Sequence, residues 1–530
     1  TVLLPFGGRT QGSETQVSVQ KLPVDGYTET ASIMAYGYNP FLTSWSPYHG
    51  AAYAVVEACA KVVAAGAEFG GMRFSYQEYF ERMHTARSWG KPLAALLGAL
   101  RMQVELGLPS IGGKDSMSGT FQQINVPPML MAFGITIVDA RRVISTDLKE
   151  AGHTLYLLKH TPKANRMPDT AALRTLWNYA SERIAAGRIV AGYAVGFGGV
   201  AEALAKMAFG NGIGAEVELP EEALFAYDYG SIVVESTVEL DAPFAVRLGR
   251  TTADEALTVN GERMPLDALR RANSERFARI YPDRGANRGT VMESTPAPRT
   301  FVYGGEAVEH PVAYLPVFPG TNCDYDTARA FRRAGAEVET TVFCNLSAEA
   351  IFRSIREMKE HIRRCHIFVL SGGFSSGDEP DGSGKFIANV LNNKDIAEEI
   401  HALLDRGGLI LGICNGFQAL VKSGLLPYGR LGCVTKDSPT LFRNDINRHV
   451  STRVASTASP WLSSFSVGDL HSIAVSHGEG KFVVGEQLAR RLFERGQVAF
   501  QYAGPDGHAT AEAPCNPNGS FYAIEGIVSE

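Results

Sequence analysis

Residues 408–420 read GLILGICNGFQAL, and this stretch decides the fold of the C-terminal part of the chain. The apolar run over residues 409–413 predicts a buried strand, and the residues after Cys414 have the apolar spacing of a helix. Glycines stand two residues to either side of the cysteine, at Gly412 and Gly416. A tight strand-to-helix turn needs small residues there, because the strand and the helix pack closely. The stretch therefore predicts a turn that presents Cys414 at its tip.

Strands and helices alternate around this turn. The segments at residues 312–318, 337–343 and 365–370 predict three more strands, of which the first is expected to be buried, and YDTARAFRRAG predicts a helix after it. Alternating strands and helices imply a doubly wound parallel sheet whose loops gather at the carboxyl edge. We therefore expect an α/β domain over residues 301–530.

Cys414 has the surroundings of a nucleophile. The N-terminus of a helix favours the thiolate over the thiol, and a thiolate can attack a carboxamide to give a thioester and ammonia. The alternative is a buried structural cysteine, which the glycine setting disfavours. Acyl transfer also needs oxyanion donors, and the amides of Gly373 and Phe374 follow the strand at 365–370. A plain flexible glycine turn is the alternative at that loop.

Composition bounds the class of protein. The chain has 530 residues, of which 45% are hydrophobic and 20% charged, so a disordered chain, a coiled coil and a collagen-like fibre are excluded. Fifty basic and 56 acidic residues give a net charge of −6, which argues against nucleic acid as a partner. The seven cysteines are widely spread without a CxxC pair, and no apolar run reaches about 18 residues. We expect a cytoplasmic protein with reduced thiols and no membrane partner.

The first 300 residues predict two modules. Helices from Tyr48 to Gly66 and over residues 91–106, followed by an apolar strand, indicate an α+β domain over residues 1–147. Residues 148–300 contain a predicted strand, a helix around 168–187, and a strand, glycine loop and helix in succession. The Pro- and Gly-rich stretch 281–300 is the best candidate for a linker.

The stretch GLPSIGGKDSMSG, residues 107–119, is expected to be a loop between a helix and a strand. Its glycine spacing does not fit a Walker motif. The loop nevertheless collects Gly113, Lys114, Asp115 and Ser116, a combination that suits a phosphate or a magnesium ion. A solvated turn is an equally good interpretation from the residues alone.

Five segments of the C-terminal part resemble a known family. They are FPGTNCDYDTARAFRRAGAEVE, LSGGFSSGDEPDGSGKF, GICNGFQAL, SHGEGKF and NPNGS. Together they resemble the class I glutamine amidotransferase domain of the phosphoribosylformylglycinamidine synthase family. The resemblance implies that Cys414 hydrolyses glutamine and that Gly373 and Phe374 line the oxyanion hole. It also places four residues in loops near the glutamine site: Asn322, Asp324, His477 and Glu479.

His477 and Glu479 have the His-x-Glu spacing of a base and its orienting carboxylate. In the family the catalytic His-x-Glu segment lies after the strand that follows NPNGS, and this chain stops at residues 525–530, where that segment would begin. Catalytic roles follow geometry rather than spacing, so we expect His477 and Glu479 to belong to a glutamine-site loop. We also expect this chain alone to be a poor glutaminase.

Segments of the first 300 residues resemble the second synthetase half of the same family. They are VVEACAKVVAAGA, PSIGGKDSMS and YAVGFGGVAEALAKMAFGNGIG. The resemblance implies an aminoimidazole ribonucleotide synthetase-like two-domain fold, with ATP and magnesium as cofactors of the parent enzyme. It implies three small-molecule partners (glutamine, ATP and formylglycinamide ribonucleotide) and an N-terminal synthetase half that is missing from this chain. It also implies that the parent is a large single-chain enzyme of which this chain is the C-terminal portion.

The synthetase half departs from the family pattern at its metal site. Glu57 matches a metal-binding glutamate, but Lys61 stands where an asparagine ligand is expected. Ala194 and Gly196 replace the Asp and Ser of the family loop. A lysine ammonium beside a metal is unfavourable and alanine supplies no ligand, so we do not expect Mg-nucleotide binding of the usual kind. Lys61 is either a partial replacement for the cation or an ordinary surface lysine.

The resemblance therefore implies a segment of an ATP-dependent amidoligase of purine synthesis. It would hydrolyse glutamine and supply ammonia for converting formylglycinamide ribonucleotide into formylglycinamidine ribonucleotide. One alternative is a catalytically incomplete scaffold or nucleotide-binding fragment. Another is a stand-alone cysteine amidohydrolase that uses the same turn.

Overall fold

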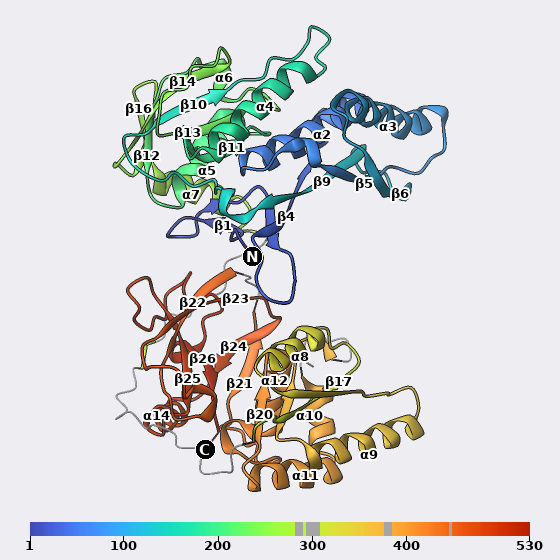
Figure 1. The fold of residues 1–530 in the computed structure, drawn as a ribbon, viewed down its shortest axis with the longest axis vertical. Coiled ribbons are helices and arrows are strands. Elements are labelled where there is room, and N and C mark those ends of the chain that lie inside the picture. The colour runs from blue at the N-terminus through green and yellow to red at the C-terminus, as the bar shows by residue number, and fades with distance from the viewer. Residues whose placement is uncertain (281–289, 293–307, 376–383, 445–447, 530) are drawn as a thin grey trace. The chain divides into compact units, whose positions relative to one another are not determined.

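The computed structural model describes residues 1–280, 290–292, 308–375, 384–444 and 448–529. The chain forms two compact units, Thr1–Ile280 and Tyr281–Glu530, and Figure 1 labels the elements of each. The predicted linker at 281–300 lies almost wholly outside the described residues. The predicted boundary at residue 148 falls within the first unit, between its two larger sheets.

The first sheet of the N-terminal unit has five strands in the order β3-β4-β9-β5-β6, in which only β5 and β6 are parallel neighbours. Its strands are β3 (Ser18–Lys21), β4 (Thr30–Gly37), β5 (Arg73–Tyr79), β6 (Ser110–Ser116) and β9 (Met129–Asp139). The prediction of a loop over residues 107–119 is therefore wrong at its centre, where β6 forms. Pairing with β5 holds β6 as an edge strand, although most of its residues are exposed and lack apolar alternation.

Short elements accompany this sheet. They are the pairs β1 (Phe6–Gly7) with β2 (Ser13–Glu14) and β7 (Thr120–Phe121) with β8 (Ile124–Asn125), the helix α1 (Pro40–Trp45), and the 3-10 turns η1 (Phe69–Gly71) and η2 (Ala140–Arg142). α1 leads directly into the next helix, α2.

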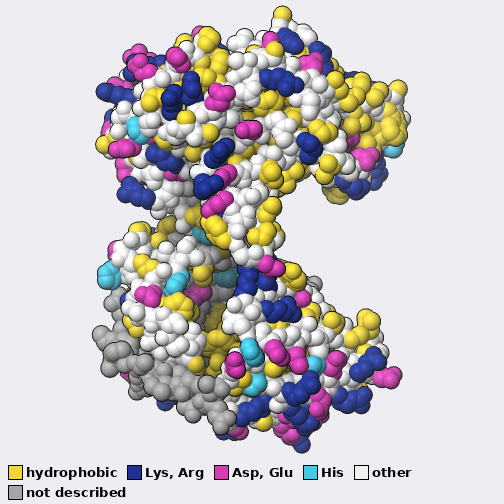
Figure 2. Space-filling model, viewed as in Figure 1, with side chains coloured by type: hydrophobic (Ala, Val, Ile, Leu, Met, Phe, Trp, Pro, Cys, Tyr) yellow, Lys and Arg dark blue, Asp and Glu magenta, His cyan; other side chains and the backbone are white. Residues whose placement is uncertain are grey.

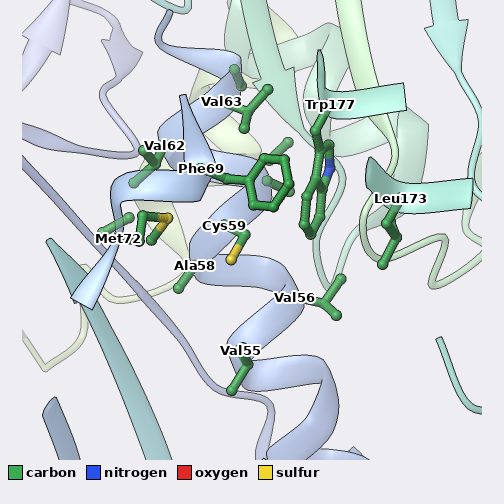
Figure 3. Packing of buried hydrophobic residues seen from close by; sticks show 14 of the residues in the cluster. Val55, Val56, Ala58, Cys59, Val62, Val63, Phe69, Met72, Leu173 and Trp177 are labelled. Carbon is green, nitrogen blue, oxygen red and sulfur yellow. The ribbon is translucent and has the colours of Figure 1, made fainter. Parts of the chain in front are cut away.

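Helix α2 (Pro47–Ala64) forms the centre of the core of the N-terminal unit, as Figure 3 shows. Every residue from Gly50 to Ala64 is buried except Lys61. Because most of these side chains are Ala or Val, α3, β4, β9 and β11 can all pack against the helix. Phe69 and Trp177 meet edge to face beside it, with ring centroids 5.3 Å apart. The helix predicted from Tyr48 to Gly66 is confirmed.

The second sheet of this unit has seven strands in the order β11-β13-β10-β14-β12-β15-β16, and only β12 and β15 are parallel. Its strands are β10 (Thr154–Leu158), β11 (Ile189–Ala194), β12 (Gly214–Val217), β13 (Ile232–Ser236), β14 (Ala245–Thr252), β15 (Ala256–Val259) and β16 (Glu262–Pro265). Its helices are α4 (Thr170–Ala185), α5 (Gly199–Phe209), α6 (Glu221–Leu224) and α7 (Leu266–Glu275). The predicted succession of strand, glycine loop and helix is confirmed as β11 followed by α5.

The C-terminal unit contains the expected parallel sheet, with four strands in the order β18-β17-β19-β20. The strands are β17 (Val312–Val317), β18 (Glu337–Val342), β19 (Ile367–Leu370) and β20 (Leu409–Gly412). The helices are α8 (Asp324–Arg333), α9 (Ala348–Arg364), α10 (Lys385–Leu391), α11 (Lys394–Asp405), α12 (Asn415–Ser423) and α13 (Leu425–Tyr428). The chain order of the strands reverses between β17 and β19, which is where such sheets place their ligands.

The same unit has a second, antiparallel part that the sequence did not predict. A sheet in the order β23-β22-β25-β26 accompanies the pair β21–β24. These strands are β21 (Thr440–Arg443), β22 (Arg448–Val454), β23 (Leu470–Val475), β24 (Glu479–Val483), β25 (Val498–Ala503) and β26 (Ile524–Ile527). The helix α14 (Glu486–Glu494) and the 3-10 turns η4 (Pro460–Leu462) and η5 (Phe521–Ala523) complete it.

Helix α3 (Ala86–Leu106) carries an apolar stripe at its surface, and Figure 2 shows hydrophobic side chains gathered over it. Six of its large side chains are exposed: Trp89, Leu93, Leu96, Leu97, Leu100 and Val104. The opposite face packs on α2. None of the helices in the described part of the chain is long and apolar enough to cross a membrane.

Two glycines of α3 provide a test of this packing. A Cβ at Gly98 would lie 2.0 Å from the carbonyl oxygen of Tyr48, whereas a Cβ at Gly90 would meet nothing within 4 Å. We expect Gly98→Ala to lower the free energy of unfolding by about 2 kcal/mol, because the helices must move apart. Gly90→Ala should raise it by up to about 1 kcal/mol through helix propensity. Urea unfolding followed by circular dichroism measures both, and equal stabilities of the two variants would contradict the packing.

Candidate active site

Cys414 lies in the turn between β20 and α12, as the sequence predicts. Its backbone has φ 52° and ψ −110°, a conformation that non-glycine residues rarely adopt. The residue is the N-cap of α12 and is exposed. Strained backbone of this kind costs about 1–3 kcal/mol and persists only where the surrounding packing enforces it. The turn therefore presents the thiol at the N-terminus of a helix.

Two glycines enforce this turn. A Cβ at Gly416 would lie 2.1 Å from the carbonyl oxygen of Leu370 in the neighbouring strand β19. A Cβ at Gly412 would lie 2.8 Å from the carbonyl oxygen of Gly416. No larger residue fits at either place without separating α12 from the sheet. The predicted reason for these glycines, close packing of strand and helix, is confirmed.

The loop after β19 contacts the loop after β17. Thr321 and Gly373 form an isolated antiparallel bridge, in which the Phe374 N–H donates to the Gly320 carbonyl at 2.8 Å. The Phe374 amide already has an acceptor in this bridge. This contradicts its predicted role as an oxyanion donor. Gly373 has φ 141°, and a Cβ there would lie 2.6 Å from the Gly320 oxygen, so only glycine fits.

Asn322, Cys323 and Asp324 lie at the start of α8, beside this bridge. The Asn322 N–H donates to the Gly372 carbonyl at 3.4 Å, and the Cys323 thiol donates to the Asn322 side chain at 3.2 Å. Asp324 is in the first turn of α8. The structure thus brings the loops after β17, β19 and β20 together at one edge of the parallel sheet.

His477 and Glu479 lie where β24 begins, against α12. The Glu479 carboxylate pairs with the Lys422 ammonium at 3.2 Å. Lys422 is eight residues along α12 from Cys414, a rise of about 12 Å. His477 has no hydrogen-bond partner for its Nδ1, and burial lowers the pKa of its imidazole. Glu479 thus pairs with Lys422 and does not orient His477. The two residues fit a loop that supports α12 better than a catalytic base with its orienting carboxylate.

Two buried polar residues of α12 were missed by the sequence reasoning. The Asn415 amide donates to the Gln418 side chain at 2.9 Å, and Gln418 donates to the Glu479 carbonyl at 2.7 Å. The Ser375 N–H donates to the Asn415 side chain at 3.3 Å. These bonds join the loop after β19, the start of α12 and β24. Two polar residues three apart in the first turns of the helix, before the apolar run of residues 419–421, were the available signal.

In the N-terminal unit, Glu57 is 8% exposed and already has a cation beside it. The Lys61 ammonium lies 2.9 Å from one carboxylate oxygen, and the Tyr38 N–H donates to the other at 3.0 Å. Lys61 also donates to the Tyr36 carbonyl at 2.9 Å and lies 4.6 Å from the centre of its ring. These contacts hold the Lys61 ammonium in one place. Lys61 is therefore not an ordinary exposed surface lysine.

The loop between β11 and α5 supplies no ligand to replace it. A Cβ at Gly196 would lie 3.9 Å from the Glu57 carboxylate, so this loop does come close. The Ala194 backbone exchanges two hydrogen bonds with Gln16, and the Gly198 N–H donates to Glu202 at 2.8 Å. Across the described ranges, no group of three or more His, Cys, Asp or Glu could hold a metal ion. A magnesium ion does not fit this donor set, because an ammonium holds the carboxylate.

Gly113, Lys114, Asp115 and Ser116 lie on the edge strand β6. Lys114 and Asp115 are exposed, the Ser116 hydroxyl lies 2.9 Å from that of Ser118, and a Cβ at Gly113 would meet the Tyr76 carbonyl at 2.4 Å. β6 pairs Asp115 with Glu78 of β5. Glu78 is 5% exposed, and one of its oxygens has no hydrogen-bond partner. Burial, with a smaller effect from Asp115, raises the pKa of Glu78 to about 7.

Two family models match separate parts of the chain. Residues 310–530 match the CobB/CobQ-like glutamine amidotransferase domain, and residues 145–278 match the C-terminal domain of AIR synthase related protein. Together with the two kinds of sheet, these matches confirm the expected fold class: an aminoimidazole ribonucleotide synthetase-like part followed by a glutamine amidotransferase domain.

Among curated proteins, the chain is similar to phosphoribosylformylglycinamidine synthase subunit PurQ of several organisms. PurQ of Gloeobacter violaceus is 33% identical over 211 residues, which are 40% of this chain and 79% of that protein. PurQ of Salinibacter ruber is 34% identical over 218 residues, which are 40% of this chain and 80% of that protein.

Among solved structures, the chain is similar to T. maritima PurL complexed with ATP. The identity is 16% and the TM-score 0.40, with 63% of this chain and 54% of that chain covered. This chain thus spans about half the length of that PurL. The thiamine monophosphate kinase of Aquifex aeolicus is 15% identical with a TM-score of 0.33, over 46% of this chain and 92% of that one.

The buried Glu78 carboxylate gives a pH-dependent prediction. Its raised pKa means that the folded state binds the proton more tightly than the unfolded state, so stability falls as pH rises from about 4.5 to 7. Glu78→Gln is neutral at every pH. We expect its free energy of unfolding, relative to that of the unsubstituted chain, to improve by about 2 kcal/mol between pH 5 and pH 8.

Urea unfolding at pH 5 and pH 8 measures this difference. The exposed Glu68 provides the matched control, because Glu68→Gln should leave the pH dependence unchanged. A difference for Glu78→Gln that does not vary with pH would contradict the burial argument.

Proposed function

This chain belongs to the phosphoribosylformylglycinamidine synthase family, and we propose that its C-terminal unit hydrolyses glutamine to supply ammonia for that synthesis. The observation that carries the proposal is the position of Cys414, exposed in a strained turn at the N-terminus of α12. Such a turn presents a nucleophile to a substrate at the carboxyl edge of the sheet.

The reaction at Cys414 is an acyl transfer. The thiolate attacks the carboxamide carbon of glutamine, the nitrogen takes a proton from water, the C–N bond breaks, and ammonia leaves. Water then cleaves the thioester, which releases glutamate and restores the thiol. The N-terminal dipole of α12 stabilises the thiolate.

The carbonyl oxygen of glutamine needs a hydrogen-bond donor as it becomes negative. We assign this role to the Gly373 N–H, since the Phe374 amide donates to Gly320. Asn322 and Asp324 border the same edge of the sheet and are candidates for binding the ends of glutamine. His477 and Glu479 are assigned to the supporting loop that Gln418 anchors.

The N-terminal unit is assigned to the synthetase part of the enzyme. The full reaction would convert formylglycinamide ribonucleotide, ATP, glutamine and water into formylglycinamidine ribonucleotide, ADP, phosphate and glutamate. We propose that a second synthetase half, absent from this chain, completes the site within a large single-chain parent. Lys114 and Asp115 on β6 are the candidates for contact with substrate or nucleotide.

An exposed apolar sheet face supports the pairing with a second half. Met34 and Tyr36 of β4 lie beside Ile135 of β9, on the same face as Ile137. These four side chains are between 41% and 67% exposed. Soluble domains rarely leave such a face uncovered. Because the Glu57 site does not fit magnesium, we assign ATP-dependent activation to the missing half rather than to this unit.

Two alternative functions make different predictions for the reactivity of Cys414. A scaffold fragment would keep the fold without a reactive Cys414, and a stand-alone cysteine amidohydrolase would lack selectivity for glutamine. Free thiols at six positions suit a reducing cytoplasm, which we propose as the location; they are Cys59, Cys323, Cys344, Cys365, Cys433 and Cys515.

Labelling with a diazoketone analogue of glutamine tests the assignment of Cys414. We expect one covalent adduct per chain, located by peptide mass spectrometry at Cys414, because only this thiol combines exposure with the strained turn. Cys414→Ala should abolish the adduct. Cys433→Ala removes another exposed thiol and should label at the rate of the unsubstituted chain.

Excess glutamine should protect Cys414 from the label, whereas excess asparagine should not. Absence of labelling in both the unsubstituted chain and Cys414→Ala would favour the scaffold function and refute the proposal. Equal protection by unrelated amides would favour the stand-alone hydrolase.

A further inference from the structure

A second cysteine lies beside the proposed nucleophile, across a glycine. A Cβ built on Gly372 would lie 3.3 Å from the Cβ of Cys414 and 3.4 Å from the sulfur of Cys323. It would also lie 3.8 Å from the Cβ of Cys323. The two cysteine Cβ atoms are therefore at most about 7 Å apart, and the space between them is kept open by the missing side chain of Gly372.

We propose that Cys323 and Cys414 form a reversible disulfide when peroxide oxidises the chain, and that this bond switches off the reaction at Cys414. Formation of the disulfide does not depend on the proposed function. Only its effect, the loss of glutamine hydrolysis at Cys414, rests on that function. The bond itself requires two reactive thiols that can meet. The glutamine site would thus carry its own redox control.

The two thiols differ from the other cysteines in their positions. Both are exposed, and each is the N-cap of a helix: Cys414 of the nine-residue α12 and Cys323 of the ten-residue α8. Exposure opens both thiols to peroxide, which attacks accessible cysteines. By contrast, burial raises the pKa of Cys365 to about 11.

The chemistry balances with hydrogen peroxide as the oxidant. The Cys414 thiolate attacks one peroxide oxygen, the O–O bond breaks, and hydroxide leaves, so Cys414 becomes a sulfenic acid. The Cys323 thiolate then attacks the sulfur of Cys414. The S–O bond breaks, hydroxide takes up a proton to leave as water, and a disulfide remains. A dithiol reductant reverses the bond by exchange.

Only the loop that carries Cys323 has to move. A disulfide needs Cβ atoms about 3.5–4.5 Å apart, so the loop must approach Cys414 by up to a few ångströms. Cys414 is fixed by the packing of α12 on β19, but Asn322 and Cys323 are exposed on a loop. The bond that the Asn322 N–H donates to Gly372 is long, at 3.4 Å. Because the Phe374 N–H holds the Gly320 carbonyl at 2.8 Å, the shift toward the gap at Gly372 is confined to the residues after Thr321.

Peptide mapping under non-reducing conditions tests this proposal on the full chain after treatment with hydrogen peroxide. We expect a Cys323–Cys414 disulfide peptide, together with a roughly tenfold loss of Cys414 alkylation by iodoacetamide that dithiothreitol reverses. Cys323→Ser should remove the disulfide and leave a sulfenic acid at Cys414, trapped by dimedone. Cys433→Ser should behave like the unsubstituted chain.

Gly372→Ala is a second test that keeps both thiols. Its methyl group fills the gap between them and should slow disulfide formation, while alkylation of Cys414 before oxidation continues. Oxidation of Cys414 without a Cys323–Cys414 disulfide in the unsubstituted chain would overturn the proposal, as would absence of any oxidation at Cys414. If the disulfide forms but the diazoketone does not label Cys414, the redox pair stands and the glutaminase assignment fails.

Discussion

The close approach of α12 to β19 is the constraint on which the C-terminal site depends. The Leu370 carbonyl lies where a side chain of residue 416 would begin, so only a glycine allows the helix to reach the sheet. This contact fixes the first turn of α12 and forces Cys414 into its left-handed conformation. The packing energy of the helix thus maintains a strained backbone at the reactive residue. The neighbouring loops, joined by the Thr321–Gly373 bridge, are placed relative to that fixed point.

The N-terminal unit shows a different use of charge. Its central helix α2 is buried on all sides, and Glu57 would be an uncompensated buried carboxylate without Lys61 one turn later. Removing one partner of such a pair is costly, because the remaining charge stays buried. The Lys61 ammonium compensates the charge of the buried carboxylate from within the same helix. This explains in physical terms how the unit keeps the expected fold although residues 194 and 196 carry no ligand side chains.

The sequence predicted features that depend on neighbouring residues along the chain. The parallel sheet, the turn at Cys414 and the helix α2 follow from apolar runs and glycine spacing, which are local signals. Features that depend on distant pairing were missed. β6 is a strand only because β5 lies beside it, and the Phe374 amide is used because Gly320 meets it from another loop. Likewise, the sequence left two roles open for Lys61, and its contacts with Glu57 and Tyr36 became visible only in the fold.

A crystal structure of the chain after reaction with the diazoketone analogue of glutamine tests the roles of Cys414 and Gly373 most directly. We expect electron density continuous with the sulfur of Cys414, an unchanged α12 packed on Leu370, and the ketone oxygen of the adduct within hydrogen-bond distance of the Gly373 N–H. An adduct on Cys323, or a ketone oxygen directed away from Gly373 toward solvent, would contradict these roles.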